Sequence, residues 1–375
     1  MESKLSNKNN ATNKQKDTMC LTFKTVVPHE YSFLLDELFD KSKIEVNKML
    51  VNRGESSSKY YKTIPCVVAK SLISKYQKNK KCKELHSLVL PICGDKGKQV
   101  KIVEGGIRIP ALFKKDIIPI LFPRPIVGFI RQVEFFKRNK IWQMSYSYNT
   151  PIKATPIFQD VYLGVDRNSV GNVAAVSLPN GEHKLLGFDT AGFTKNFRNR
   201  RAKLQTKGAK NALKKIKQKQ SRRIKCVNHK VSKTIVNLAK KHCCGIKLEN
   251  LGSINKRGSK AKRYVQKSQW SFYQLETFIT YKATLLGIPI YYINPRNTSK
   301  TCSRCGSINI ANGKHYKCKF CGYVAHRDIN ASINIRRSPI EQGRGRAQTL
   351  SGLIDNPLNY TASALVETES SGGDR

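Results

Sequence analysis

The segment Tyr162-Leu163-Gly164-Val165-Asp166-Arg167-Asn168 is a short apolar run that ends in one carboxylate. Its length and apolar content predict a buried β-strand with Asp166 at its carboxyl end. Two further strands are expected at 172–178 and 184–188, joined by the hairpin turn Pro179-Asn180-Gly181-Glu182. Three sequential antiparallel strands with an acid on the first are typical of the beginning of an RNase H-type α/β fold.

Two further acids occupy comparable places. Glu249 follows Asp166 by 83 residues, at the end of a predicted apolar strand, and Asp328 follows 79 residues later, at the start of a predicted helix. Taken singly, each has an ordinary explanation: Asp166 caps a turn, Glu249 pairs with a lysine, and Asp328 is an N-cap. Taken together, they match the carboxylates that hold two Mg²⁺ ions about 3.5–4 Å apart in phosphodiester cleavage. We therefore expect these three acids to form a divalent-metal site.

The charge balance indicates the kind of partner. Lysine and arginine number 69 against 25 acids, a formal net charge of +44, and the pI is about 10.0. Self-repulsion of this size indicates a polyanionic partner that neutralises it. Nucleic acid is the expected partner, with binding that weakens as salt rises. An anionic membrane surface is the alternative, but no amphipathic helix with an aromatic face supports it.

No segment is expected to enter a membrane. The N-terminus to about Asp17 is polar and lacks the apolar core of a signal peptide. The most apolar window, 106–130, is interrupted by charged residues and prolines. A cytoplasmic, nucleoid-associated protein is therefore expected. The eleven cysteines of such a chain are expected to be thiols or metal ligands rather than disulfides.

Four of these cysteines have the spacing of a zinc ribbon: they form two C-x2-C pairs separated by twelve residues, Cys302, Cys305, Cys318 and Cys321. Four thiolates suit a tetrahedral Zn²⁺ at about 2.3 Å and leave no open position for a substrate. Gly306 and Gly322 follow the two pairs and allow each loop to turn toward the thiolates. A redox dithiol is the alternative, and the presence of two paired units argues against it. His315 and His326 are expected to be loop residues near the completed metal shell.

The first half of the chain changes its hydrophobic period. Residues 1–18 have almost no apolar side chains and are expected to be disordered. A strand is predicted at 21–27, a basic helical segment from 30 to about 90, and further strands at 100–103, 127–136 and 141–148. These strands suggest a small barrel, closed by the strand at 21–27, with the helices as an insertion. A helical bundle with a solvated face is the alternative for the helical segment.

Basic helices are expected again at 193–242, with a narrow apolar stripe. No acids compensate their charge, which favours contact with phosphates over a merely solvated face. An amphipathic helix at 270–286 and a short strand at 288–293 precede the cysteines. The candidate nucleic-acid contacts, from both basic helical regions, are Tyr60, Tyr61, Lys62, Arg200, Arg201, Lys214, Lys215, Arg222 and Arg223.

Four segments carry a resemblance to a known family. They are Gly164-Val165-Asp166, Leu248-Glu249-Asn250-Leu251, the run from Thr298 to Gly306, and Arg327-Asp328-Ile329-Asn330-Ala331-Ser332-Ile333-Asn334-Ile335. In this order and spacing they resemble the TnpB family, transposon-encoded OrfB-type proteins related to compact type V CRISPR nucleases. The resemblance covers about 160–336, and the first half is similar in layout alone. One departure is Arg167-Asn168, where many relatives carry smaller residues.

The resemblance implies a multidomain α/β architecture: a RuvC-like RNase H fold with an inserted zinc ribbon, preceded by a wedge barrel with a helical recognition insertion. The expected boundaries are 1–18 for the disordered N-terminus, 19–30 for the first wedge strand, 31–98 for the recognition insertion, 99–158 for the wedge β-barrel, 159–296 for the RuvC-like nuclease, 297–325 for the zinc ribbon, 326–337 for the last RuvC helix and 338–375 for a flexible tail.

The resemblance also implies roles. Asp166, Glu249 and Asp328 fall on the family's catalytic, Mg²⁺-binding acids, and the four cysteines fall on its zinc ligands. Family members use a guide RNA derived from the transposon end, recognise a short flanking DNA motif and cut the matched double-stranded target. An RNA-guided DNA endonuclease is therefore expected. The alternatives are a catalytically silent nucleic-acid-binding regulator encoded in a transposon and a strand-transferring transposase.

Overall fold

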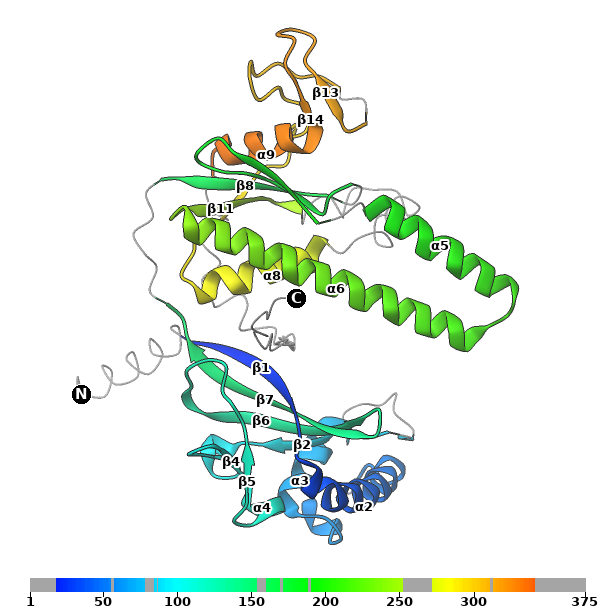
Figure 1. The fold of residues 1–375 in the computed structure, drawn as a ribbon. Coiled ribbons are helices and arrows are strands. Elements are labelled where there is room, and N and C mark those ends of the chain that lie inside the picture. The colour runs from blue at the N-terminus through cyan, green and yellow to red at the C-terminus, as the bar shows by residue number, and fades with distance from the viewer. Residues whose placement is uncertain are drawn as a thin grey trace, which may run out of the picture. The chain divides into compact units, whose positions relative to one another are not determined.

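The computed structural model describes residues 18–54, 57–77, 84–85, 87–153, 160–168, 171–187, 190–251, 272–310 and 313–340. The chain folds into two compact units that divide between Pro151 and Ile152 (Figure 1). The predicted disorder of 1–18 and the flexible tail of 338–375 fall almost entirely outside the described residues. Thr18, however, already belongs to the first strand. Within the described residues, no helix is long and apolar enough to cross a membrane.

The first unit is built on a four-stranded antiparallel sheet with the order β1-β7-β6-β2. Its strands are β1 (Thr18–Val26), β7 (Ile141–Pro151), β6 (Val127–Arg138) and β2 (Leu90–Cys93). The early strand pairs with the late hairpin as the sequence predicts, with Leu21 opposite Tyr148. The turn between β6 and β7 places Asn139 and Lys140 at φ values of 50° and 64°, as a tight hairpin turn requires.

A smaller sheet accompanies this one, formed by β3 (Lys101–Val103), β4 (Gly106–Arg108) and β5 (Ile117–Pro119), with the short helix α4 (Pro110–Phe113) between β4 and β5. In the described part of the unit, β1 and β2 are the edges of an open four-stranded sheet. The hydrogen bonds therefore do not close into the barrel that the strand pattern suggested. Aromatic packing fills the core instead, with Phe23 stacked 5.2 Å from Tyr148.

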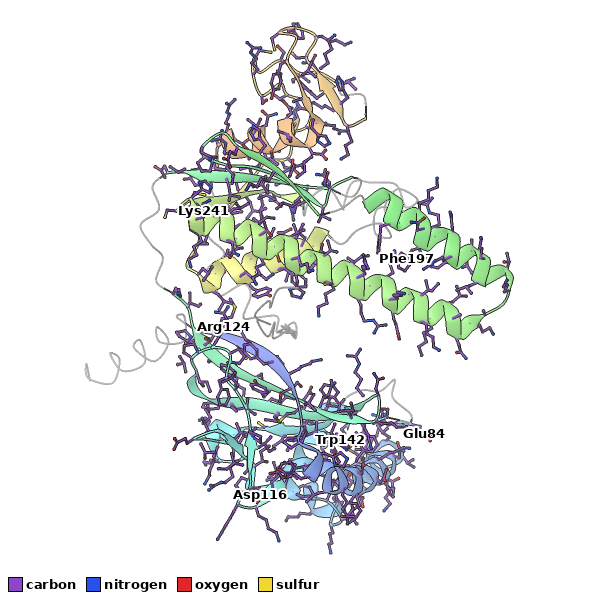
Figure 2. All side chains as sticks on the ribbon, in the orientation of Figure 1. Glu84, Asp116, Arg124, Trp142, Phe197 and Lys241 are labelled. Carbon is purple, nitrogen blue, oxygen red and sulfur yellow. The ribbon has the colours of Figure 1, made fainter. Side chains whose placement is uncertain are left out.

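The helices of the first unit are α2 (Ser32–Val51), which follows the short turn η1 (His29–Tyr31), and α3 (Cys66–Leu72), which continues as the π-helical turn η3 (Ile73–Gln77). Trp142 of β7 is labelled in Figure 2 and is buried. It donates its indole N–H to Asp36 of α2 at 3.0 Å and meets Phe39 of the same helix edge-on. Strand β2 lies inside the segment 31–98 that was predicted to be helical. That prediction missed β2 because a four-residue strand containing Pro91 has little periodicity of its own.

The second unit contains a five-stranded mixed sheet with the order β10-β9-β8-β11-β12. The strands are β10 (His183–Leu186), β9 (Ala174–Ser177), β8 (Tyr162–Arg167), β11 (Gly245–Glu249) and β12 (Ile290–Ile293). The first three pair antiparallel, and β11 pairs parallel with both β8 and β12. The predicted three-strand start is therefore confirmed, and β8 is the central strand.

Helices cover both faces of this sheet (Figure 1). Leu163, Val165 and Leu248 form one buried core with apolar residues of α6 (Lys210–Lys241) and α8 (Phe272–Leu285). Helix α9 (Arg327–Arg337) packs on the opposite face, so closely that a Cβ at Gly164 would lie 2.2 Å from the Ser332 carbonyl oxygen. Helix α5 (Thr190–Thr206) precedes α6, and the hairpin β13 (His315–Lys317) and β14 (Val324–His326) precedes α9.

Candidate metal centres

Two strand ends and one helix start bring the three predicted acids to one face of the sheet. Leu248 is opposite Val165 in the parallel ladder, so Asp166 and Glu249 end adjacent strands. Since side chains alternate along a strand and Val165 and Leu248 point into the α6/α8 core, both acids point to the α9 side. Asp328 lies in the first turn of α9, where His326 rather than Asp328 is the N-cap. The three acids are 8%, 8% and 3% exposed.

The electrostatics indicate that these carboxylates act on one another. Burial, and then the negative charges of Glu249 and Asp328, raise the pKa of Asp166 well above its ordinary value. Burial also raises the pKa of Glu249, against the hydrogen bond from Thr298 and the charge of Arg167. Buried acids of the same charge destabilise one another unless a cation compensates them. The site therefore has the charge of a cation-binding site.

The carboxylates do not converge as tightly as the thiolates do. In the described part of the chain, the four cysteines form a group whose ligand atoms all lie within 4.8 Å of one another, and the three acids do not form such a group. Two neighbours that the sequence analysis did not identify hold the acids. Lys314 donates to Asp328 at 2.5 Å, and the Thr298 hydroxyl donates to a carboxylate oxygen of Glu249.

Arg167, the departure from the family pattern, turns away from the acids. It follows Asp166 and therefore points to the α8 side of the sheet, where its side chain is fully buried. Its guanidinium donates to Glu276 of α8 at 2.5 Å and to the main-chain carbonyl of Glu249 at 2.6 Å. The carboxyl end of β8 thus presents the carboxylate of Asp166 on the α9 face and the guanidinium of Arg167 on the α8 face.

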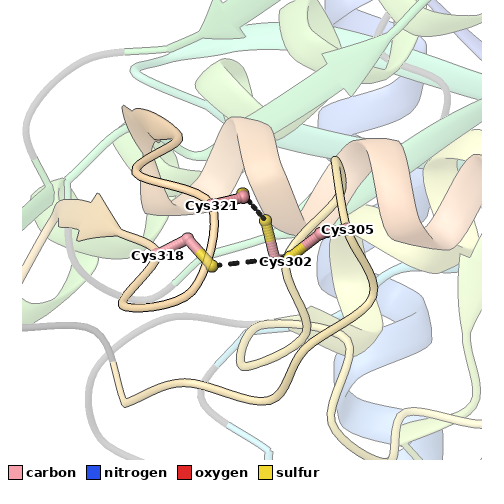
Figure 3. A group of neighbouring side chains, drawn as sticks. All are labelled: Cys302, Cys305, Cys318 and Cys321. Atoms are coloured by element: carbon pink, nitrogen blue, oxygen red, sulfur yellow. Dashed lines mark hydrogen bonds between the residues drawn. The ribbon is translucent and has the colours of Figure 1, made fainter.

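The four predicted zinc ligands lie together (Figure 3). The sulfur atoms of Cys302 and Cys321 are 3.7 Å apart, and those of Cys305 and Cys318 are 3.6 Å apart. A tetrahedral Zn²⁺ with Zn–S bonds of about 2.3 Å requires sulfur separations of about 3.8 Å, so these distances fit the metal. Gly306 and Gly322 have φ values of 78° and 69°, which confirms the turns expected after each pair. Neither His315 nor His326 belongs to the cluster.

Two asparagines fasten this cysteine module to α9. Asn330 accepts from the Ser303 amide at 2.9 Å and donates to the Thr301 carbonyl at 2.7 Å. Asn334, one turn later, donates to the carbonyls of Thr298 and Thr301. Their i, i+4 spacing in the quoted segment 327–335 was the available signal, because it places two amides on one helix face.

Most of the predicted nucleic-acid contacts are accessible. Tyr60 is 61% exposed, and the basic candidates are exposed except for Arg201, which is half-buried. The accessible basic candidates are Lys62, Arg200, Lys214, Lys215, Arg222 and Arg223. They belong to α5 and α6 apart from Lys62, and side chains project along both helices in Figure 2. Tyr61 is a correction: at 4% exposed it packs in the core and cannot meet nucleic acid.

Comparison with known proteins finds similarity to two related groups of proteins. The model for the Cas12f1-like TNB domain matches residues 272–335, the segment that includes the cysteine module. The chain is 32% identical over 218 residues to the CRISPR-associated endodeoxyribonuclease Cas12f1 of Sulfoacidibacillus thermotolerans, covering 53% of this chain and 50% of that protein. It is 31% identical over 161 residues to a TnpB-like protein of Methanocaldococcus jannaschii, covering 40% of this chain and 58% of that protein. The chain thus spans about half the length of the curated relatives it matches.

A solved structure supports the fold. The cryo-EM structure of the Cas12f1–sgRNA–target DNA complex superposes with a TM-score of 0.54 at 20% identity, covering 84% of both chains. At this identity the likeness concerns the mixed α/β, multidomain architecture. Together with the matched TNB model and the two groups of relatives, it supports a TnpB-family, Cas12f-related protein.

Proposed function

We propose that this protein is an RNA-guided DNA endonuclease of the TnpB type, which hydrolyses a phosphodiester bond of target DNA next to a short flanking motif. The observation that carries the proposal is the meeting of Asp166, Glu249 and Asp328 on the α9 face of the sheet. In a chain with 25 acids against 69 lysines and arginines, three buried carboxylates on one face of the sheet need a functional reason.

The residues present fit Mg²⁺. Carboxylate oxygens are the ligands that this hard cation prefers, and three separate elements supply them here. Bound Mg²⁺ supplies Lewis-acid stabilisation of the phosphodiester and lowers the pKa of a water nucleophile. Burial, and then the negative charges of Glu249 and Asp328, raise the pKa of Asp166, and a divalent cation would compensate that charge.

The chain's own residues prepare this site. The Thr298 hydroxyl orients the Glu249 carboxylate by donating to it, and the ammonium of Lys314 compensates the negative charge of Asp328. The Lys314 side chain is 36% exposed, so a DNA phosphate that reaches the acids would meet it. Asn330 and Asn334 fix α9, and with it Asp328, to the cysteine module.

The other parts of the chain support the same activity. Four cysteines close together hold a structural Zn²⁺ in the proposed zinc ribbon. The exposed lysines and arginines of α5 and α6 contact phosphates of the guide RNA and the target strand. The complex of the related Cas12f1 contains sgRNA and target DNA. The domain boundaries 159–296 for a RuvC-like nuclease and 31–98 with 99–158 for recognition and wedge modules belong to this proposal.

Purification with sequencing of co-purified RNA, followed by cleavage assays, tests the proposal. A bound RNA with a variable 3′ segment and Mg²⁺-dependent cutting of the matching DNA are the expected results. Asp166→Ala, Glu249→Ala and Asp328→Ala should each abolish cutting while RNA binding is retained. Asp160→Ala is the matched control, because Asp160 is an exposed acid just before the same strand. Undiminished cutting by Asp166→Ala overturns the site, and an RNA-free protein that binds transposon ends favours a regulator or a strand-transferring transposase.

A further inference from the structure

Arg167 is a buried cation whose position the proposed chemistry does not by itself require. Its side chain has no exposed surface, and it lies on the opposite face of the sheet from the acids. It therefore cannot touch the substrate or the reacting phosphate. Burial of a charged guanidinium destabilises the fold unless hydrogen bonds and an opposite charge compensate it, so the contacts of Arg167 decide why it is tolerated here.

Those contacts join three elements. One guanidinium nitrogen of Arg167 donates to Glu276 of α8 at 2.5 Å, and the other donates to the main-chain carbonyl of Glu249 at 2.6 Å. Tyr292 of β12 is the ladder partner of Leu248, and burial and then the negative charge of Glu276 raise the pKa of its phenol. The guanidinium thus connects the end of β8 with the end of β11 and with α8.

The contact to the Glu249 carbonyl is the informative one. That carbonyl and the carboxylate that faces the acidic site belong to the same residue. Asp166, likewise, is the immediate neighbour of Arg167. Because two adjacent strand ends each carry one acid, a hydrogen bond between those ends fixes how far apart the acids are held. One terminal nitrogen of the Arg167 guanidinium makes this bond while the other is held by Glu276. The single ammonium of a lysine cannot reproduce this planar, two-donor geometry.

We propose that Arg167 is a positioning residue that sets the divalent-metal affinity of the carboxylate site, by tying the carboxyl end of β11 to that of β8 from the far side of the sheet. This inference rests on the proposed function of Asp166, Glu249 and Asp328 as metal ligands. It predicts that the carbonyl contact matters to the metal and that the ion pair with Glu276 matters mainly to stability.

Three variants separate these roles. Arg167→Met removes both contacts, Arg167→Lys keeps the charge but loses the fork, and Glu276→Gln removes the ion pair while leaving the carbonyl contact. Mn²⁺ binding to the purified zinc-loaded protein, followed by electron paramagnetic resonance, is the readout that does not depend on cleavage. We expect Arg167→Met to weaken Mn²⁺ binding by about tenfold or more, as loss of groups that orient metal ligands does. Arg167→Lys should lie between it and wild type, and Glu276→Gln should stay within about twofold of wild type.

The outcomes distinguish this inference from the function on which it rests. Asp166→Ala and Asp328→Ala serve as references, and thermal melts identify any variant that fails to fold. If the reference variants lose Mn²⁺ binding but Arg167→Met and Arg167→Lys do not, the positioning role is overturned and the metal site stands. If Glu276→Gln weakens binding as much as Arg167→Met, the role is that of an ordinary ion pair and the inference fails. If the reference variants bind Mn²⁺ as wild type does, the acids are not the metal ligands and both proposals fall.

Discussion

The ammonium of Lys314 lies 2.5 Å from a carboxylate oxygen of Asp328, so the segment that carries the cysteines supplies a counter-charge to the acidic site. The Asp328 side chain is 5% exposed, whereas Lys314 is 36% exposed. The same lysine covers the loop after β8, since a Cβ at Gly171 would lie 3.0 Å from its Cε. Within the described residues, Lys314 is therefore a cation of the cysteine module that contacts the acidic site directly.

Replacing this lysine should make the metal-free protein depend on added cation. In Lys314→Met the buried Asp328 loses its partner, and we expect a loss of about 1–2 kcal/mol of unfolding free energy, less than for a fully buried pair because Lys314 is partly solvated. Millimolar Mg²⁺ should recover most of this loss. Thermal melts with and without Mg²⁺ measure both effects. Lys317→Met, at an exposed position of β13, is the control and should change neither value.

The ionised carboxylate of Asp166 should destabilise the folded, metal-free protein, although the proposed metal site needs it. Burial and two neighbouring negative charges raise the pKa of Asp166, which means that its ionised form is destabilised in the folded protein. Asp166→Asn removes that charge with little change of shape. We expect it to raise the melting temperature of the metal-free protein by a few degrees, as removal of functional strain commonly does, and to abolish cleavage. A lower melting temperature for Asp166→Asn in chelator would contradict the electrostatic account.

The cysteine module should need its metal. Cys302→Ser or chelation should remove about one Zn²⁺ per chain and release the turns at Gly306 and Gly322, because binding energy of a structural zinc is folding energy. Metal content by atomic emission and protease sensitivity of 297–325 provide the measurements. Cys226→Ser, at an exposed thiol of α6, is the matched control. Equal zinc content in Cys302→Ser and Cys226→Ser would show that the four cysteines are not the ligands.

Sequence periodicity was sufficient for part of this arrangement. Asp166 and Glu249 were predictable because each ends an apolar strand, and parallel strand ends meet at one edge of a sheet. The partners of these acids were not predictable in the same way. Arg167 reaches Glu276 across 109 residues of sequence, and no local pattern distinguishes that glutamate from the others. Tyr61 is a case in which the local pattern gave the wrong prediction. An aromatic residue within a basic segment suggests a nucleic-acid contact, but Tyr61 is buried in the core.

A half-buried histidine should make the α6/α8 interface sensitive to acid. His229 stacks on Phe278 with ring centroids 3.8 Å apart, and burial, then Lys282 and Lys225, lower its pKa to about 4. Below about pH 6.5 the unfolded chain therefore takes up a proton that the folded chain refuses, so stability falls as pH drops from 6.5 toward 4. After allowance for solvent screening, we expect this residue to account for about 1–2 kcal/mol.

His229→Gln tests this expectation, because glutamine does not titrate in the range. Urea unfolding at pH 7 and pH 5 should show a smaller difference in the variant than in wild type. The exposed His183 also has a lowered pKa, so His183→Gln is the control that checks the contribution of a second histidine. If wild type and His229→Gln lose the same stability between the two pH values, His229 is not the acid-sensitive group.

Gly164 should be the most sensitive backbone position of the central strand. A Cβ there would lie 2.2 Å from the Ser332 carbonyl oxygen and 2.5 Å from the Arg336 amide nitrogen, both main-chain atoms of α9. Since neither can move without shifting the helix, Gly164→Ala should push α9 outward and cost about 3 kcal/mol or more. Helix α9 carries Asp328, so the shift should also separate this acid from Asp166 and lower cleavage by more than the loss of folded protein explains. Melting temperature and cleavage rate per folded molecule measure the two effects.

Gly54→Ala is the control for this prediction. A Cβ at Gly54 meets nothing within 4 Å, so Gly54→Ala should leave both the melting temperature and the cleavage rate at wild-type values. A Gly164→Ala protein with wild-type stability would mean that α9 does not pack on β8 as closely as the backbone contacts require.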